Sequence, residues 1–414
     1  MGFFQAKLTG RRSMFALFAI AALAQPASAK WVAAWGSAQQ LVEPGNEAPA
    51  AAFTGATLRQ VVRITLAGQA VRIRFSNAFG SEPLTIDGAH VARAVAAGSA
   101  RIVAGSDRAL TFDRRPSVTI PAGADYLSDP VALDVAALSS VAVSVMLAAA
   151  PKQQTGHPGS RTRSFYQPGD QLAATDMSAA RPIEHWYLLS GVEVDASPRA
   201  AAIITLGDSI TDGRGSTTDG NDRWPDLLAD RLQDSPKTRA LSVVNVGIGG
   251  NRLLLDGIGP NALARFDRDV LARPGVKAVI VLEGVNDLGT LTRERAATRD
   301  EHRALIGRMI AGYRQIIARA HAHGVRVIGV TIMPYMGMDY YHPDAANEAD
   351  RQAVNAWIRT SGAFDAVADL DAATRDPARP DRLLPAYDSG DHIHPSPAGF
   401  KAMAAAIDLK ALFR

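Results

Sequence analysis

The alternation of hydrophobic and polar residues changes near position 200. Over residues 31–194, apolar and polar positions alternate in short runs, as where Val71, Ile73 and Phe75 are interleaved with polar residues. Such a period of two is typical of strands with one buried face, and the runs are separated by turn residues. We therefore predict an antiparallel β-sandwich or jelly-roll-like domain over residues 30–195.

Beyond residue 200, short runs that are apolar throughout alternate with amphipathic stretches. Strands that are apolar on both faces occur in parallel sheets covered by helices on each side. We predict a three-layer α/β/α, flavodoxin-like domain over residues 200–414, with a five-stranded parallel sheet. The predicted strands are 201–206, 241–246, 277–283, 325–333 and 366–370, and the predicted helices are 222–233, 300–322, 349–361 and 396–413.

The first 29 residues have a separate character. Lys7, Arg11 and Arg12 precede an apolar stretch, and residues 27–29 read Ala-Ser-Ala, which suits a signal peptidase. We predict a signal peptide over residues 1–29 and export to the periplasm or the medium, by the general or the twin-arginine route. The apolar stretch is too short to span a bilayer comfortably, so no stable membrane anchor is expected after cleavage.

Removal of this leader changes the charge balance. The whole chain has 44 basic and 41 acidic side chains; the leader holds three of the basic ones and no acidic one, which leaves 44 − 3 = 41 of each. A formally neutral mature chain gives no reason to expect a nucleic-acid partner. The chain has no cysteine, so disulfides, thiolate nucleophiles and cysteine-ligated metals are excluded.

Polar clusters follow four of the predicted parallel strands. In open α/β sheets, ligands bind outside the carboxyl ends of the strands, so these clusters should meet in one crevice. They are Gly207-Asp208-Ser209, "GIGGN" at 247–251, "GVND" at 284–287 and "MPYMGMDYYH" at 333–342.

Ser209 is a candidate nucleophile. A serine becomes one when a base takes its proton, a third group orients that base, and fixed donors await the oxyanion. Asp391 and His394, in "DHIHP", are three residues apart and can face each other within one loop. His392 also adjoins Asp391 but would point elsewhere. Taken alone, Gly-Asp-Ser could equally be a plain turn.

Other chemistries fit the sequence less well. The nucleophile-elbow pattern G-x-S-x-G and the phosphate-binding loop are absent. "GIGGNR" places Arg252 where a dinucleotide fingerprint needs its third glycine. A metal on Asp391, His392 and His394 is conceivable, but no further cluster with ligand spacing accompanies it. We expect neither a metal nor a cofactor.

Together, the four clusters resemble the SGNH (GDSL) hydrolase superfamily, over roughly residues 200–414. "GDSITDG" matches the block with the serine, "NVGIGGN" the block with the glycine, "GVND" that with the asparagine and "DHIHP" that with the histidine, in this order. The resemblance implies a catalytic triad of Ser209, His394 and Asp391. It also implies an oxyanion hole made of the backbone N–H groups of Ser209 and Gly250 and the side chain of Asn286. Since Gly249 precedes Gly250, the glycine donor is ambiguous by one residue.

Neighbouring polar residues have plainer interpretations. We expect Asp208 and Asp287 to bond nearby backbone amides, and Asn245 to tie a loop. The tyrosine- and methionine-rich segment after the fourth strand suits an acyl or aryl group. The residues expected to line the substrate site are Tyr335, Met336 and Tyr340; the alternative is a loop packed on its neighbours.

The first region resembles the β domain that precedes the catalytic domain in secreted SGNH esterases grouped with arylesterases and xylan-associated acylhydrolases. Its tryptophans could stack on sugars or belong to a core; they are Trp31, Trp35 and Trp186. The expected function is a secreted serine esterase for small acyl or aryl carboxylic esters, including O-acetyl groups of polysaccharides. The alternatives are a lysophospholipase, thioesterase or acyltransferase with the same machinery, and a non-catalytic carbohydrate-binding protein.

Overall fold

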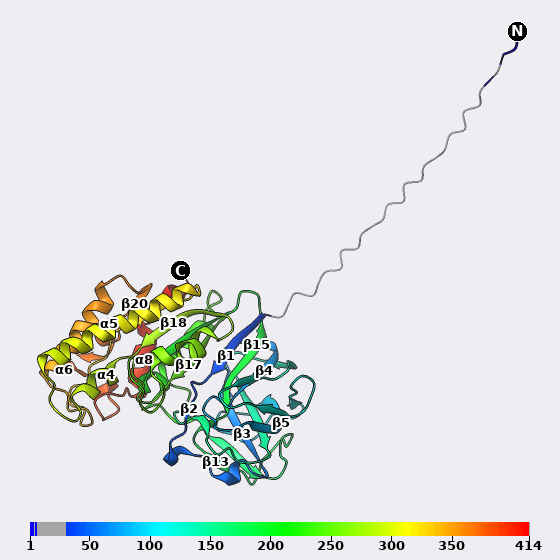
Figure 1. Cartoon of the computed structure of the whole chain (residues 1–414), viewed down its shortest axis with the longest axis horizontal. Helices are drawn as coiled ribbons and strands as arrows, with labels where there is room; N and C mark the ends of the chain where they lie inside the picture. Colours follow the sequence, from blue (N-terminus) through cyan, green and yellow to red (C-terminus); the bar gives the residue numbers. More distant parts are fainter. Residues whose placement is uncertain (4, 6–29, 414) are drawn as a thin grey trace.

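The computed structural model describes residues 1–3, 5 and 30–413 (Figure 1). Most of the predicted signal peptide therefore lies outside the described residues. Among the residues described, no helix combines the length and the apolar character needed to cross a membrane.

The strands of residues 30–196 form antiparallel sheets. They are β1 (Lys30–Gly36), β2 (Gln40–Leu41), β3 (Ala56–Arg63), β4 (Gly68–Ser76), β5 (Leu84–Arg93), β6 (Arg108–Ala109), β7 (Val118–Ile120), β8 (Asp125–Leu127), β9 (Val131–Val135), β10 (Ser140–Leu147), β11 (Thr155–His157), β12 (Ser164–Pro168), β13 (Arg181–Ile183), β14 (Trp186–Tyr187) and β15 (Leu189–Ala196). One sheet has the order β1-β15-β4-β8, with β9 beside β4, and a second has the order β13-β12-β3-β10-β5-β6, with β7 beside β5. A small third sheet joins β14, β11 and β2.

The two larger sheets share one apolar core. In β4, Val71, Ile73 and Phe75 are buried, whereas the arginines between them are partly exposed, so the alternation seen in the sequence is confirmed. The buried side chains of β4 lie in the same core as Val143 and Val145 of β10, which belongs to the other sheet. This arrangement buries one face of each sheet, as in a sandwich.

The second half of the chain contains the predicted five-stranded parallel sheet. Its strands are β16 (Ala201–Gly207), β17 (Leu241–Gly247), β18 (Val276–Leu282), β19 (Arg326–Val330) and β20 (Ala366–Ala368). They lie in the order β17-β16-β18-β19-β20, and every neighbouring pair is parallel. With the strands numbered along this region the order is 2-1-3-4-5, which is the flavodoxin-like order. The predicted fold class is thus confirmed.

Helices pack around this sheet in two groups. The helices are α1 (Ser209–Asp212), α2 (Trp224–Gln233), α3 (Ala262–Phe266), α4 (Val285–Thr292), α5 (Arg299–Ala322), α6 (Ala345–Thr360), α7 (Leu370–Thr374) and α8 (Pro397–Ala406). The long helix α5 contacts α3, α4, α6 and β19, while α2 contacts α8 and β17, and Figure 1 shows α5 running along the parallel sheet. The predicted helix over 396–413 is wrong beyond Ala406, because Asp408 accepts the backbone N–H of Lys410 and starts a new short turn.

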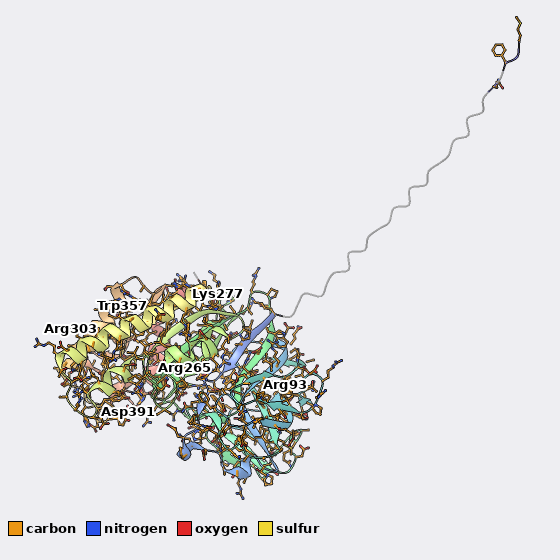
Figure 2. All side chains as sticks on the ribbon, viewed as in Figure 1. Arg93, Arg265, Lys277, Arg303, Trp357 and Asp391 are labelled. Atoms are coloured by element: carbon orange, nitrogen blue, oxygen red, sulfur yellow. The ribbon has the colours of Figure 1, made fainter. Side chains whose placement is uncertain are left out.

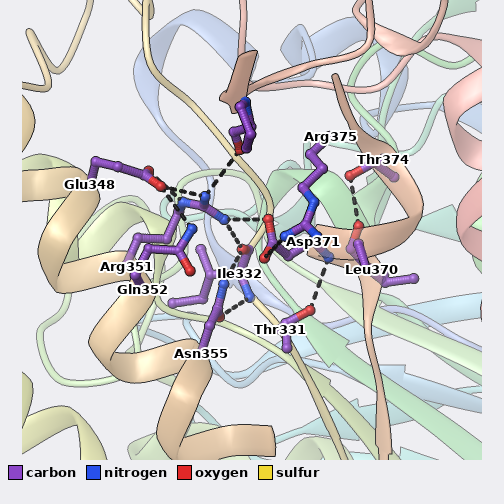
Figure 3. Close-up of polar contacts among 12 residues, drawn as sticks. Thr331, Ile332, Glu348, Arg351, Gln352, Asn355, Leu370, Asp371, Thr374 and Arg375 are labelled. Atoms are coloured by element: carbon purple, nitrogen blue, oxygen red, sulfur yellow. Dashed lines mark hydrogen bonds and ion pairs between the residues drawn. The ribbon is translucent and has the colours of Figure 1, made fainter. Parts of the chain in front are cut away.

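The fourth parallel strand ends three residues earlier than predicted. Residues 331–333 are still buried, but the backbone groups of Ile332 bond to side chains of α6 instead of a neighbouring strand. Asn355 accepts the N–H of Ile332 at 2.7 Å, and Asn355 and Arg351 both donate to its carbonyl. Arg351 also pairs with Asp371 and Glu348 (Figure 3). These buried polar groups lead the chain away from the sheet toward the site.

The antiparallel sheets and the parallel sheet are in direct contact. Ser242 of β17 donates its hydroxyl to the carbonyl of Ala33 in β1, and the hydroxyl of Thr65 donates to the carbonyl of Val243. One continuous apolar core contains residues of both halves. In Figure 1, β1 lies between β15 and the parallel sheet. This contact sets the position of the loops that the first half contributes to the site.

Candidate active site

Ser209 lies at the turn that ends the first parallel strand. β16 ends at Gly207, and the carboxylate of Asp208 accepts the backbone N–H of Ile210 at 2.9 Å, which caps the short helix α1 at Ser209. A side chain at Gly207 would collide with Thr211 and with the backbone of Leu282, so the turn requires glycine there. The predicted turn therefore exists, and it places Ser209 at the carboxyl edge of the sheet.

His394 and Asp391 meet Ser209 from the far end of the chain. The hydroxyl of Ser209 lies 2.8 Å from Nε2 of His394, and Nδ1 of the same ring lies 2.6 Å from a carboxylate oxygen of Asp391. Burial works against ionisation of Asp391. The hydrogen bonds from the ring and the backbone N–H of His394 outweigh that effect and lower its pKa. Asp391 is thus ionised and fixes Nδ1 as the proton-bearing nitrogen, which leaves Nε2 as the acceptor.

His392 has a similar carboxylate partner but lies apart from the serine. Its Nδ1 is 2.6 Å from Asp388, its side chain is exposed, and its backbone has a φ of +67°. His392 therefore bonds Asp388, whereas His394 bonds Asp391 and Ser209. Of the two histidines in "DHIHP", only His394 contacts Ser209, as the sequence predicted.

Asn286 and Gly250 lie on the same pocket as Ser209. Asn286 donates one amide N–H to the carbonyl of Asn251 at 2.8 Å and accepts the hydroxyl of Tyr341 at 2.7 Å. Burial raises the pKa of Tyr341, so this hydroxyl stays protonated and keeps donating. Within the described residues, the backbone N–H groups of Ser209 and Gly250 donate to no protein acceptor. They remain available for a ligand.

The neighbouring polar residues bond the backbone as expected. Asp287 accepts the N–H groups of Leu253 and Leu254 at 2.7 and 3.0 Å. Asn245 donates to the carbonyl of Thr211 and accepts the N–H of Gly247. These ties hold the glycine-containing loop against the serine turn.

The pocket around the serine has a volume of about 780 Å³. Of the three predicted substrate-lining residues, only Tyr340 lies on it; the predictions for Tyr335 and Met336 are wrong. Tyr335 is buried with the segment that follows β19, and the chain then turns at Gly337, with a φ of +95°. This turn brings Met338, Tyr340 and Tyr341 to the pocket instead.

The tryptophans of the first region are packing residues. Trp35 and Trp186 are buried with their rings edge to face at 4.8 Å, and the guanidinium of Arg72 covers the ring of Trp31. Since Trp35 and Trp186 are almost inaccessible, they cannot stack on a sugar in this conformation.

A buried histidine–carboxylate pair joins the two halves, and the sequence did not indicate it. Nε2 of His157, in β11, lies 2.9 Å from the carboxylate of Asp212, which lines the pocket. Nδ1 of His157 lies 2.8 Å from the carbonyl oxygen of Ala38. A side chain at Gly159 would collide with the same carboxylate. Asp212 belongs to the block "GDSITDG", but nothing in that block or around His157 indicates that the two residues meet.

Arg265 is a second residue that the sequence did not indicate, and it connects the loops of the site. The side chain is fully buried and donates to the carbonyls of Gly207 and Val246 and to the side chain of Asn251. It thereby ties together the ends of β16 and β17 and the glycine-containing loop. It also forms an ion pair with Asp269 and lies 3.4 Å from a carboxyl oxygen of Glu283.

Three buried carboxyl groups lie close to one another: Asp208, Glu283 and Asp287. Burial, together with neighbouring carboxylates, raises the pKa of Asp208 to about 7 and the pKa of Glu283 well above its usual value. Burial likewise raises the pKa of Asp287 to about 6. Among the residues that the structure describes, one carboxyl oxygen of Glu283 has no hydrogen-bond partner. Ionising Glu283 therefore costs folding free energy.

We expect Glu283→Gln to change the pH dependence of stability. The folded protein binds the Glu283 proton more tightly than the unfolded chain, so this group's stabilising contribution is complete below the ordinary pKa of 4.5 and declines as pH rises toward the raised pKa. Glutamine does not ionise. The melting temperature of the variant should match wild type near about pH 5 and exceed it near about pH 8. The corresponding difference in the free energy of unfolding should grow by at most about 1.4 kcal/mol per pH unit.

Thermal melts at both pH values measure this gap, with Glu82→Gln, at an exposed carboxyl group, as the control for replacing a carboxyl by an amide. A Glu283→Gln gap that does not change with pH, or that favours wild type at the higher pH, contradicts the assignment.

Within residues 30–413 and the few described before them, no group of three or more metal-ligating side chains is close enough to hold an ion. Of the three residues considered for a metal, His394 pairs with Asp391, whereas His392 pairs with Asp388.

Comparison with known protein families gives a match to the second half of the chain. Residues 205–402 match the model of the GDSL-like Lipase/Acylhydrolase family. A search of curated proteins finds no match.

Solved structures similar to the chain include three esterases or lipases. An aryl esterase from M. smegmatis is 17% identical, covers 52% of this chain and 100% of its own, and has a TM-score of 0.39. An acetyl xylan esterase from Geobacillus stearothermophilus is 23% identical over 52% of this chain and 95% of its own, with a TM-score of 0.37. A GDSL-like lipase from Bacteroides thetaiotaomicron is 20% identical over 51% of this chain and 87% of its own, also with a TM-score of 0.37.

Proposed function

Because the chain belongs through residues 205–402 to the GDSL-like lipase/acylhydrolase family of SGNH hydrolases, which hydrolyse esters, we propose that it is a serine esterase acting on carboxylic esters through an acyl-enzyme. The observation that carries the proposal is the continuous contact from Ser209 through His394 to Asp391 at 2.8 and 2.6 Å, on the wall of an open pocket. A carbohydrate-binding protein has no need of such an arrangement.

In the proposed reaction, Nε2 of His394 takes the proton of Ser209 as Oγ attacks the ester carbonyl. Asp391 holds the ring and stabilises the imidazolium that forms. As the tetrahedral intermediate collapses, His394 gives the proton to the leaving alcohol and the acyl group stays on Ser209. His394 then activates a water molecule, which attacks the acyl-enzyme and releases the acid.

The oxyanion would be held by the backbone N–H groups of Ser209 and Gly250 and by the amide of Asn286. The amide is oriented before substrate binds, since Asn251 accepts one of its hydrogens and Tyr341 donates to its oxygen. Donors that are fixed in advance stabilise the developing charge without reorganisation at the moment of reaction.

We expect Asn286→Ala to lower kcat about 10²- to 10³-fold with little change in KM, because the lost donor acts on the oxyanion more than on the ground-state ester. Steady-state kinetics with p-nitrophenyl acetate measure both constants. The comparison variant is Tyr341→Phe, which removes one of the two groups that orient Asn286 and should lower kcat less. A larger loss in Tyr341→Phe than in Asn286→Ala would contradict the assignment.

The pocket suits small acyl or aryl groups. Met338, Tyr340 and Tyr341 supply apolar and aromatic surface beside the serine, and an open pocket of about 780 Å³ admits an ester group on a larger molecule such as a polysaccharide. We include export in the proposal, on the strength of the basic and apolar pattern of residues 1–29.

Covalent labelling tests the proposed nucleophile. A p-nitrophenyl phosphonate should inactivate the enzyme with release of one p-nitrophenolate per chain, and mass spectrometry should find the adduct on the peptide that contains Ser209. An adduct on another peptide, or none, overturns the proposal.

A further inference from the structure

We propose that the preferred esters carry a negatively charged oxyacid group, such as a carboxylate, which arginines at the mouth of the pocket bind. The inference rests on the proposed function and specifies its substrate class. Four arginines line the pocket that contains Ser209: Arg161, Arg214, Arg252 and Arg293. Two carboxylates, Glu43 and Asp212, line it as well, so the lining has a formal excess of 4 − 2 = 2 positive charges with histidines neutral.

Arg161 has the least compensated charge of the four. It lies in the loop after β11 in the first half of the chain, and the carbonyl of Arg161 accepts the backbone N–H of Asp219 at 2.9 Å, which ties this loop to the loop after α1. Within the part of the chain that the structure describes, its buried Nε has no hydrogen-bond partner and its guanidinium forms no ion pair. A buried donor that lacks an acceptor destabilises the unliganded protein. An oxyanion in the pocket could supply one.

Arg252 is positioned without being neutralised. Its guanidinium donates to the carbonyls of Leu255 and Asp256, the first at 3.2 Å. Carbonyl groups orient a guanidinium but carry no net charge. Asn261 bonds one carboxylate oxygen of Asp256, and among the described residues no carboxylate forms an ion pair with Arg252. The positive charge of Arg252 therefore acts on the pocket from a fixed place.

The other two arginines contribute less. Arg214 is exposed, and its nearest acidic group is Asp391 at 3.8 Å, a carboxylate already bonded to His394. Arg293 forms an ion pair with Glu294 and a hydrogen bond with Tyr340. We therefore assign anion binding chiefly to Arg161 and Arg252.

The acids of the lining do not cancel this charge. Asp212 is bonded to the buried His157, and Glu43 accepts the side-chain amide of Asn46. A cleft that combines low-dielectric walls with charge of one sign concentrates ligands of the opposite sign. A guanidinium group also presents two parallel N–H donors that match two oxygens of a carboxylate, phosphate or sulfate group, which favours these oxyacid groups over anions without that geometry.

The test compares esters that are matched in size and differ in charge. The first pair is p-nitrophenyl hemisuccinate and p-nitrophenyl pentanoate, with the charge on the acyl side; the second is p-acetoxybenzoate and p-acetoxybenzamide, with the charge on the leaving group. Each kcat/KM is divided by the rate of alkaline hydrolysis of the same ester. We expect the anionic member of at least one pair to be preferred roughly tenfold or more, the size of one charge-assisted hydrogen bond.

Arg161→Gln and Arg252→Gln should each reduce the anionic preference several-fold, and about 0.5 M salt should reduce it in wild type. The control is Arg303→Gln, since Arg303 projects from the outer edge of the molecule (Figure 2) and should leave the preference unchanged. Equal rates within both pairs, or a preference that neither pocket variant alters, overturn the inference and leave the esterase proposal intact. Absence of hydrolysis of all four esters refutes the esterase proposal itself.

Discussion

Ser209→Ala should lower kcat/KM for p-nitrophenyl acetate by about 10⁵- to 10⁶-fold, which is the order of loss when a triad nucleophile is removed. Without Oγ no acyl-enzyme forms, and the remaining donors can only polarise the ester toward attack by water. The fold should be unaffected, because the hydroxyl of Ser209 bonds no residue except His394 among those described. Steady-state rates and thermal melts of the purified variant measure the two effects.

Ser216→Ala is the matched control. Ser216 lies in the loop that follows the same short helix, and its hydroxyl donates to the carbonyl of Gly213 instead of a histidine. Its activity should stay within about twofold of wild type, since a surface change of this kind shifts stability only slightly. If Ser209→Ala retains activity comparable to Ser216→Ala, Ser209 is not the nucleophile.

Asp391→Asn has the second-largest expected effect, a loss of about 10⁴ in kcat. Asparagine retains an oxygen that can accept the backbone N–H of His394 at the present 2.9 Å. However, it removes the negative charge that stabilises the imidazolium, and its amide N–H favours a proton on Nε2 of His394. That nitrogen then cannot accept the serine proton. The loss should appear in kcat much more than in KM, as measured with p-nitrophenyl acetate.

The same loop offers a close control for this variant. Asp388 holds His392 at 2.6 Å, the same separation as between Asp391 and His394, and His392 has no contact with Ser209. Asp388→Asn should therefore retain activity within a few-fold of wild type. A loss in Asp388→Asn that equals the loss in Asp391→Asn would mean that both variants disturb the loop and not the triad.

Much of the architecture could be predicted because it depends on local patterns. The period-two runs before residue 200 and the apolar runs after it each reflect which faces of a strand are buried, and both patterns are confirmed. The error at β19 arose where buried side chains of α6, chiefly Asn355 and Arg351, replace the bonds of the sheet. An apolar run looks the same whether its backbone bonds to a strand or to buried side chains.

The candidate site was also partly predictable. Ser209, Gly250, Asn286 and His394 each follow an element end or occur in a short motif, and the carboxyl ends of parallel strands meet at one edge of a sheet. The substrate-lining residues were predicted less well, because the turn at Gly337 exchanges Tyr335 and Met336 for residues a few positions later. The orientation of a loop side chain depends on backbone turns that residue type alone does not specify.

The amino-acid sequence alone thus determined the fold class, the order of the motif blocks and the candidate catalytic residues. Each of these depends on residues within one short segment or at the end of one element. The contribution of the first half to the pocket is different. His157 meets Asp212, and Arg161 reaches the pocket, only because β1 packs on the parallel sheet and brings the loop after β11 to the serine. Contacts between distant segments depend on the relative placement of two packed regions, and no periodicity or spacing within either segment records that placement.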